Sequence, residues 1–301
     1  MIRIGRCVAV LAAMLVAAEV AVAQDKPRVI AVNYATHYMA ERLLGDAADV
    51  IYPVPDGTDP SFWRPSVADI SEIQSADLIL LNGAGFATWT SRVSLPRSKL
   101  VDTSRGLEDR LIATETITHS HGDGGEHSHE GTASYTWLDP RMARAQAIGI
   151  ADALKARGFD DEDQIDSRLA TLSDELDGLE RLGQDSLAGL ADTVFVATHP
   201  RYQYLARAFG LTILSLEWEA GTAPSDRELG ELVELVASDG VDVLIWEAQP
   251  PQEARRAIAD LGVQDVVFPP LAVAPDDAEF LDAFTQGLSA LSAAAARAAG
   301  G

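Results

Sequence analysis

Residues 161–190 read DEDQIDSRLATLSDELDGLERLGQDSLAGL, and this segment decides how the rest of the chain is arranged. Its acidic start suits the positive end of a helix dipole. A helix of this length spans about 45 Å, which is long for a globular interior but suitable for a strut between two lobes. Apolar residues recur every three or four positions and share one helix face: Ile165, Leu169, Leu172, Leu176, Leu179 and Leu182.

Short apolar runs alternate with helical patterns on both sides of this segment, which is typical of parallel α/β sheets. We therefore predict an α/β fold with two small, Rossmann-like parallel-sheet lobes joined by one long linking helix. The expected boundaries are 24–158 for the N-terminal lobe, 159–191 for the linking helix and 192–301 for the C-terminal lobe. The predicted strands are 28–34, 50–54, 77–81 and 99–102, then 193–197, 211–216, 241–246 and 265–268.

Helical patterns fill most of the sequence between these strands. A short helix is predicted at 39–44, a helix over 66–74 with Ser66 as its N-cap, and a further helix around Trp89. Later helices are predicted at 141–157, 202–209, 226–237, 253–261 and 276–299.

The first 23 residues resemble a secretory signal peptide. Arg3 and Arg6 precede an almost wholly apolar run, and Ala21-Val22-Ala23 forms a cleavage site of the A-x-A type. We therefore expect residues 1–23 to be removed and the mature protein to be periplasmic. Cleavage would also remove Cys7, the only cysteine, so a metal would have to be held by nitrogen and oxygen ligands.

The composition excludes several classes of function. The net charge is −23, with 46 acidic residues and only 23 basic ones, which argues against a nucleic-acid partner. An acidic surface attracts cations, although only diffusely. The sequence lacks Gly-x-Ser-x-Gly, a phosphate-binding glycine loop and His-Glu-x-x-His, so we do not predict an enzyme. A hydrolase that uses a histidine-bound metal stays open as an alternative.

Four of the six histidines lie within residues 119–129, which read HSHGDGGEHSH. In an extended backbone each His-x-His pair can direct two rings to one side, and the intervening glycines allow the segment to fold back. Neutral imidazole is the commonest ligand of zinc, copper and nickel in proteins. We predict that this histidine-rich loop binds a divalent transition metal through His119, His121, His127 and His129.

Two further candidate ligands follow predicted strands, where open α/β sheets bind their ligands. His199 follows the strand 193–197, and Glu247 follows the strand 241–246. Glu217 and Glu219 are weaker candidates in so acidic a chain. For His37 a packing or capping role is the better interpretation.

Several motifs together resemble the periplasmic metal-binding subunits of zinc and manganese ABC transporters, over nearly all of the mature length. They are Val54–Pro60 (VPDGTDP), Ala76–Gly83 (ADLILLNG), Trp137–Pro140 (WLDP) and Phe195–His199 (FVATH), with Tyr204 and Gly210-Leu211 after them. The resemblance implies two α/β lobes joined by a long helix, with a metal bound in the cleft and delivered to a membrane permease. It also implies a histidine-rich loop, which many zinc members carry where this chain has residues 119–129.

The usual ligand positions of that family correspond to Ser61, Tyr135, His199 and Pro269, so only His199 is retained. Since a zinc site needs about three or four protein ligands, His199 alone cannot reproduce the usual site. Either the loop supplies most ligands and docks over the cleft to meet His199 or Glu247, or the cleft has lost metal binding and the loop buffers ions nearby. We favour the first.

We therefore predict a monomeric, divergent solute-binding protein that captures zinc for an ABC permease. The main alternative is a periplasmic metal buffer or chaperone that is not coupled to a permease. Manganese is disfavoured, because its sites usually contain more oxygen ligands.

Overall fold

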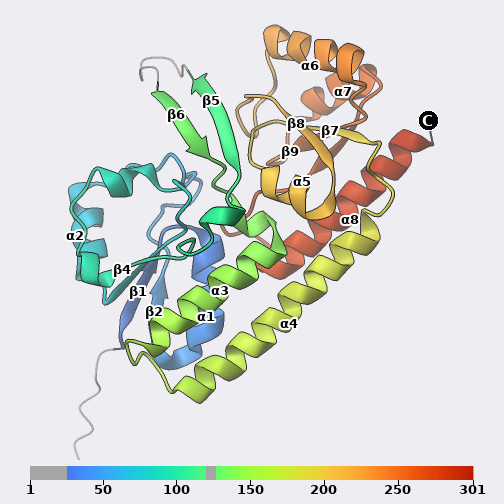
Figure 1. Cartoon of the computed structure of the whole chain (residues 1–301). Helices are drawn as coiled ribbons and strands as arrows, with labels where there is room; N and C mark the ends of the chain where they lie inside the picture. The colour runs from blue at the N-terminus through green and yellow to red at the C-terminus, as the bar shows by residue number, and fades with distance from the viewer. Residues whose placement is uncertain (1–25, 120–126, 301) are drawn as a thin grey trace, which may run out of the picture.

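The computed structural model describes residues 26–119 and 127–300, so the predicted signal peptide and His121 lie outside the described residues. Two parallel four-stranded sheets lie on either side of the long helix α4, Glu162–Ser186 (Figure 1). Asp161 caps this helix by accepting hydrogen bonds from the backbone of Asp163 and Gln164. The helix has 25 residues and is about 38 Å long, somewhat shorter than predicted.

The sheet of the N-terminal lobe has the strand order β2-β1-β3-β4. All of its pairings are parallel, and the middle strands β1 and β3 are apolar and mostly buried after Arg28, as expected for a sheet covered on both faces. Ser66 forms the predicted cap of α2 in a complete capping box with Asp69. The elements are β1 (Arg28–Ala31), α1 (Tyr34–Leu44), β2 (Asp49–Ile51), α2 (Val67–Ser75), β3 (Leu78–Leu81), β4 (Leu100–Asp102) and α3 (Pro140–Lys155).

The sheet of the C-terminal lobe repeats this arrangement in the order β10-β9-β7-β8, again with parallel pairings only. Its last helix, α8, packs against α4 and so returns to the linking helix (Figure 1). The elements are β7 (Val194–Ala197), α5 (Gln203–Phe209), β8 (Thr212–Ser215), α6 (Asp226–Asp239), β9 (Val243–Trp246), α7 (Gln252–Asp260), β10 (Gln264–Val267) and α8 (Phe280–Ala299). The predicted α/β fold with two parallel-sheet lobes is confirmed.

Several local predictions were wrong. Helix α1 begins at Tyr34 and not at residue 39, and β1 ends at Ala31 and not at residue 34. The segment interpreted as a loop contains an antiparallel hairpin of β5 (Ala113–His119) and β6 (His127–Thr132), which projects on the side of the molecule away from α4 (Figure 1). Trp89 lies in a short 3₁₀ helix, Thr88–Ser91, not in a longer α-helix. Helix α8 begins at Phe280, where burial begins, and not at residue 276.

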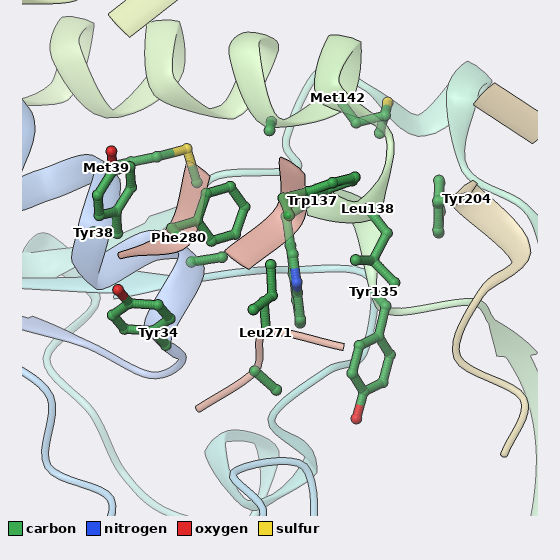
Figure 2. Packing of buried hydrophobic residues seen from close by; sticks show 14 of the residues in the cluster. Tyr34, Tyr38, Met39, Tyr135, Trp137, Leu138, Met142, Tyr204, Leu271 and Phe280 are labelled. Carbon is green, nitrogen blue, oxygen red and sulfur yellow. The ribbon is translucent and has the colours of Figure 1, made fainter. Parts of the chain in front are cut away.

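The two lobes share a continuous apolar core. Trp137 from the N-terminal half lies beside Leu271 and Phe280 from the C-terminal half (Figure 2). The Trp137 indole nitrogen donates a hydrogen bond to the Pro270 carbonyl at 2.8 Å, and the Tyr34 amide donates to the Ala272 carbonyl at 3.0 Å. The segment after β10 therefore joins the C-terminal lobe to the core of the N-terminal lobe. Within the described ranges, no helix combines the length and apolar character needed to cross a bilayer.

Candidate metal site at the contact between the lobes

His199 and Glu247 lie side by side at the carboxyl end of the C-terminal sheet. His199 follows β7 and Glu247 follows β9, and these two strands are neighbours at the point where the strand order reverses. His199 Nδ1 lies 4.0 Å from Glu247 Oε1. The fold thus brings together two of the residues predicted as ligands.

Arg201 occupies the space next to this pair. Its Nε lies 3.0 Å from Glu247 Oε1, and its Nη2 lies 2.7 Å from Oδ2 of Asp59. Asp59 belongs to the N-terminal lobe, in the turn that follows β2, whereas Arg201 and Glu247 belong to the C-terminal lobe. The guanidinium therefore bridges carboxylates of both lobes, and only 8% of Arg201 is exposed.

Two aromatic rings of the N-terminal lobe complete the surroundings of Arg201. The guanidinium carbon lies 5.2 Å from the Tyr135 ring centroid and 6.0 Å from the Phe62 ring centroid. Both distances lie within the range of cation–π attraction. Figure 2 shows the Tyr135 hydroxyl directed away from Leu138, while the Tyr135 ring packs beside Trp137 with their centroids 4.9 Å apart.

Burial dominates the ionisation of these groups. It raises the pKa of Glu247 to about 7, with Arg201 acting in the opposite direction and Asp59 and Glu217 adding to the rise. Burial disfavours the charge on Arg201, but the oxygen groups around it outweigh that effect and raise the pKa of the guanidinium. Burial also raises the pKa of Tyr135 well above its usual value. The surroundings of Arg201 therefore favour its charged form.

The other family ligand positions hold groups with different roles. The Ser61 hydroxyl and amide both donate to Asp59 Oδ1, at 2.6 and 2.8 Å, and so orient the carboxylate that contacts Arg201. Tyr135 is buried against Arg201, and Pro269 offers no side-chain donor atom. Among the side chains that the structure describes, no group of three or more His, Cys, Asp or Glu is arranged to hold a metal ion.

Three of the four predicted loop ligands lie in the hairpin. His119 ends β5 and His127 begins β6, and these residues lie directly opposite each other in the antiparallel register. His129, two residues further along β6, lies opposite Ile117. The backbone at His119, His127 and His129 is therefore extended, and their role as metal ligands stays a prediction.

His37 lies in the first turn of α1, and its contacts agree with the packing interpretation. Its Nδ1 is 3.3 Å from the Glu41 carboxylate one turn later, and its ring is near those of Tyr34 and Tyr52, with centroids 6.3 and 6.1 Å away. The sequence reasoning missed Arg201 and Asp59. Arg201 stands two positions after the strand-end His199, and Asp59 stands in the turn-rich segment 55–60, but neither segment marks the pairing between them.

Comparison with solved structures shows that this two-lobed architecture is shared with metal-binding solute-binding proteins. The Zn(II)-bound ZnuA-like domain of Streptococcus pneumoniae AdcA superposes with a TM-score of 0.75 at 21% identity, over 90% of this chain and 99% of that domain. The solute-binding protein FpvC of Pseudomonas aeruginosa, in complex with Mn²⁺, gives a TM-score of 0.73 at 19% identity, over 91% of this chain and 99% of that one. At these identities the likeness establishes the fold alone.

Residues 29–294 match the model of the family described as zinc-uptake complex component A, periplasmic (ZnuA), and the chain belongs to this family. It is 26% identical over 257 residues to the zinc-binding lipoprotein AdcA of Streptococcus pneumoniae, and the match covers 83% of this chain. It is 23% identical over 281 residues to the high-affinity zinc uptake system protein ZnuA of Bacillus subtilis, covering 89% of this chain and 87% of that protein. The chain spans about half the length of AdcA (51%). The family is named for uptake and not for catalysis, which agrees with the prediction that the protein is not an enzyme.

Proposed function

We propose that this protein captures zinc outside the cytoplasm and delivers it to an ABC permease. The observation that carries the proposal is the hairpin, in which His119 and His127 lie opposite each other and His129 follows two residues later. Membership in a zinc-uptake family and the sheet-end position of His199 support the same function. The signal peptide at 1–23, the periplasmic location, the monomeric state and the division into 24–158, 159–191 and 192–301 belong to this proposal.

We infer that the zinc ligands are drawn from His119, His121, His127 and His129, together with His199. Four nitrogen ligands suffice for the tetrahedral coordination that zinc prefers. Glu247 stays in the set as the carboxylate beside His199, with Oε2 as its candidate ligand atom, because the contacts of Arg201 and His199 are both to Oε1. Zinc is the cargo, so binding must be reversible.

A zinc titration with a competing chelator tests this ligand set. We expect high-affinity zinc binding to be lost in the fourfold variant His119→Ala/His121→Ala/His127→Ala/His129→Ala. The His199→Ala variant should bind zinc at least about tenfold more weakly than the parent protein. His37→Ala serves as the matched control, since His37 contacts Glu41 in α1. Undiminished affinity and stoichiometry in the fourfold variant would reject the role of the loop.

The alternative is a zinc buffer or chaperone with no permease partner. It is favoured by the finding that the side chains described between the lobes include no three-ligand group, because zinc held mainly by the hairpin could be exchanged without lobe movement. Zinc-dependent binding of the purified protein to a permease in proteoliposomes would support import. Zinc transfer to soluble apo-proteins with no such binding would support the buffer.

A further inference from the structure

Arg201 is enclosed by acidic and aromatic groups from both lobes. Asp59, Phe62 and Tyr135 approach it from the N-terminal lobe. Glu247 approaches it from the C-terminal lobe. The Arg201 side chain is 9% exposed and that of Glu247 only 3%, so this ion pair is almost completely removed from solvent.

A buried guanidinium is tolerated only when its charge is compensated and its donors are satisfied. The charge of Arg201 is compensated by two carboxylates, which lie within 3.0 Å of different guanidinium nitrogens, and by two ring faces. Each compensating group is a short-range partner, so separating the lobes would leave Arg201 without Asp59 and without both rings. The arrangement therefore favours a state in which the lobes are in contact.

The carboxylates that Arg201 holds are also the groups that an entering divalent cation would need. Asp59 and Glu247 face Arg201 from opposite sides of the contact between the lobes, and His199 lies 4.0 Å from Glu247. A divalent ion placed between these carboxylates would be repelled by the guanidinium and would compete with it for the same oxygens.

We propose that the Arg201 guanidinium takes the place of a metal ion at the contact between the lobes. It pairs with both Asp59 and Glu247, holds the lobes together without metal, and excludes a divalent ion from the space between those two carboxylates. The part about lobe closure is independent of the proposed zinc capture. The part about exclusion rests on the proposed zinc capture, because the exclusion places the zinc beside the hairpin and His199 and not between Asp59 and Glu247.

The distance between the lobes in metal-free protein tests the closure. Spin labels at Ser71→Cys in α2 and Ala237→Cys in α6, in a chain with Cys7→Ser, would report this distance by double electron–electron resonance; both positions are exposed. For the protein that retains Arg201, we expect the metal-free form, prepared with excess chelator, to give the same distance distribution as the zinc-loaded form. Arg201→Gln should shift the distribution to longer distances, and identical distributions in the two proteins would overturn the closure.

Two further variants protect this test. Asp59→Asn removes the carboxylate with which the N-terminal lobe contacts Arg201. Because the Asp59 side chain is 28% exposed, we expect this variant to fold, so it can replace Arg201→Gln if that variant does not. Asp59→Asn should also lengthen the distance. Arg42→Gln is the matched control, because Arg42 pairs with Glu175 at 2.6 Å between α1 and α4, away from the contact between the lobes, and it should leave the distance unchanged.

A second measurement tests the exclusion of a divalent ion. In the variant without the four loop histidines, zinc is titrated with and without Arg201→Gln. We expect Arg201→Gln to gain up to one zinc equivalent that the parent variant lacks, and loss of that gain when His199→Ala is added. No gain would overturn the exclusion, whereas zinc binding by the parent variant itself would count against the proposed loop ligands.

Discussion

The indole nitrogen of Trp137 donates a 2.8 Å hydrogen bond to the Pro270 carbonyl, across 133 positions of sequence and between the two halves of the molecule. Trp137 is fully buried and packs against Phe86 and Tyr135, with ring centroids 5.1 and 4.9 Å away. Pro270 lies in the segment after β10 that crosses to the N-terminal lobe. This hydrogen bond therefore holds the crossing segment against the core of the N-terminal lobe.

Trp137→Phe is expected to lower the free energy of unfolding by about 1–3 kcal/mol beyond the loss of ring volume, because the Pro270 carbonyl loses its buried donor. Trp89→Phe is the matched control. Trp89 is also buried, but within the described part of the chain its indole nitrogen has no hydrogen-bond partner. Urea denaturation of both variants gives the difference, and equal losses would contradict the argument.

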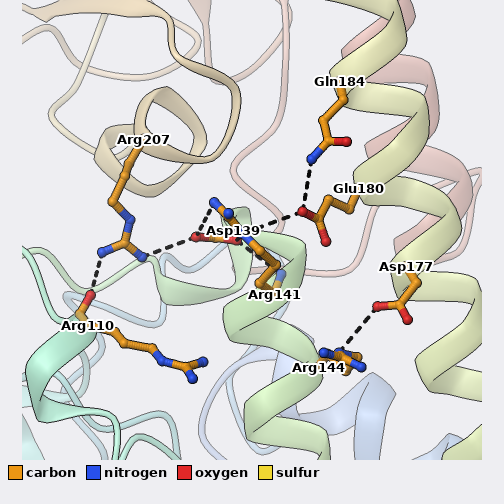
Figure 3. A network of polar contacts seen from close by, with 8 residues as sticks. All are labelled: Arg110, Asp139, Arg141, Arg144, Asp177, Glu180, Gln184 and Arg207. Atoms are coloured by element: carbon orange, nitrogen blue, oxygen red, sulfur yellow. Dashed lines mark hydrogen bonds and ion pairs between the residues drawn. The ribbon is translucent and has the colours of Figure 1, made fainter.

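Asp139 should be the most sensitive member of the polar network between α3, α4 and α5 (Figure 3). Its carboxylate caps α3 by accepting from the Arg141 amide at 3.0 Å, and it also pairs with Arg207 of α5 at 3.1 Å. Because its side chain is only 3% exposed, Asp139→Ala should cost about 2–4 kcal/mol, combining a lost cap with unpaired arginines.

Asp177→Ala is the comparison for Asp139→Ala in the same network. Asp177 pairs with Arg144 at 3.2 Å, but its side chain is 35% exposed and caps no helix. A surface pair of this kind contributes about 0–1 kcal/mol. Thermal denaturation should therefore separate the two variants clearly, and similar melting temperatures would refute the ranking.

Hydrophobic periodicity was sufficient to predict the lobes, the long helix and most strands, since these depend on local patterns with periods of about 3.6 and 2. The hairpin was missed because its strands are marked by β-branched residues at Thr114, Thr116 and Thr118 and not by an apolar core face. The two histidine pairs drew attention to metal binding, and their glycine-rich connection suggested a loop.

The ligand candidates His199 and Glu247 could be placed together from the sequence because strand ends in parallel sheets share one edge. Arg201 could not, because its role depends on Asp59, which is 142 positions away in the other lobe. Nothing local distinguishes an arginine that closes a contact between lobes from one that faces solvent.

Gly183→Ala in α4 is expected to destabilise the protein by about 1–3 kcal/mol, because the new methyl group would overpack the contact with α5. A Cβ at Gly183 would lie 2.2 Å from a ring carbon of Phe209, which is too close without movement of the ring or the helix. Gly178→Ala in the same helix is the matched control. There the nearest atom is 3.8 Å away, at the end of the flexible Arg181 side chain, so helix propensity should stabilise by about 0.5–1 kcal/mol. Urea denaturation should show a lower free energy of unfolding for Gly183→Ala and a higher one for Gly178→Ala. A higher free energy of unfolding in both variants would show that α4 and α5 are not in tight contact.

The pH dependence of stability should include a contribution from His37. Burial lowers the pKa of His37, and Glu41 and the Val50 backbone only partly offset this effect. As the pH falls below about 6.5, the unfolded chain therefore takes up a proton that the folded chain resists, so the free energy of unfolding decreases. His37→Gln removes this group, and we expect the variant to lose less stability than the parent protein between pH 7.5 and pH 5.5. Denaturation at both pH values in the presence of chelator measures the difference, since the other histidines are common to both proteins. An equal loss in the two proteins would mean that folding leaves the proton affinity of His37 unchanged, against the burial seen in α1.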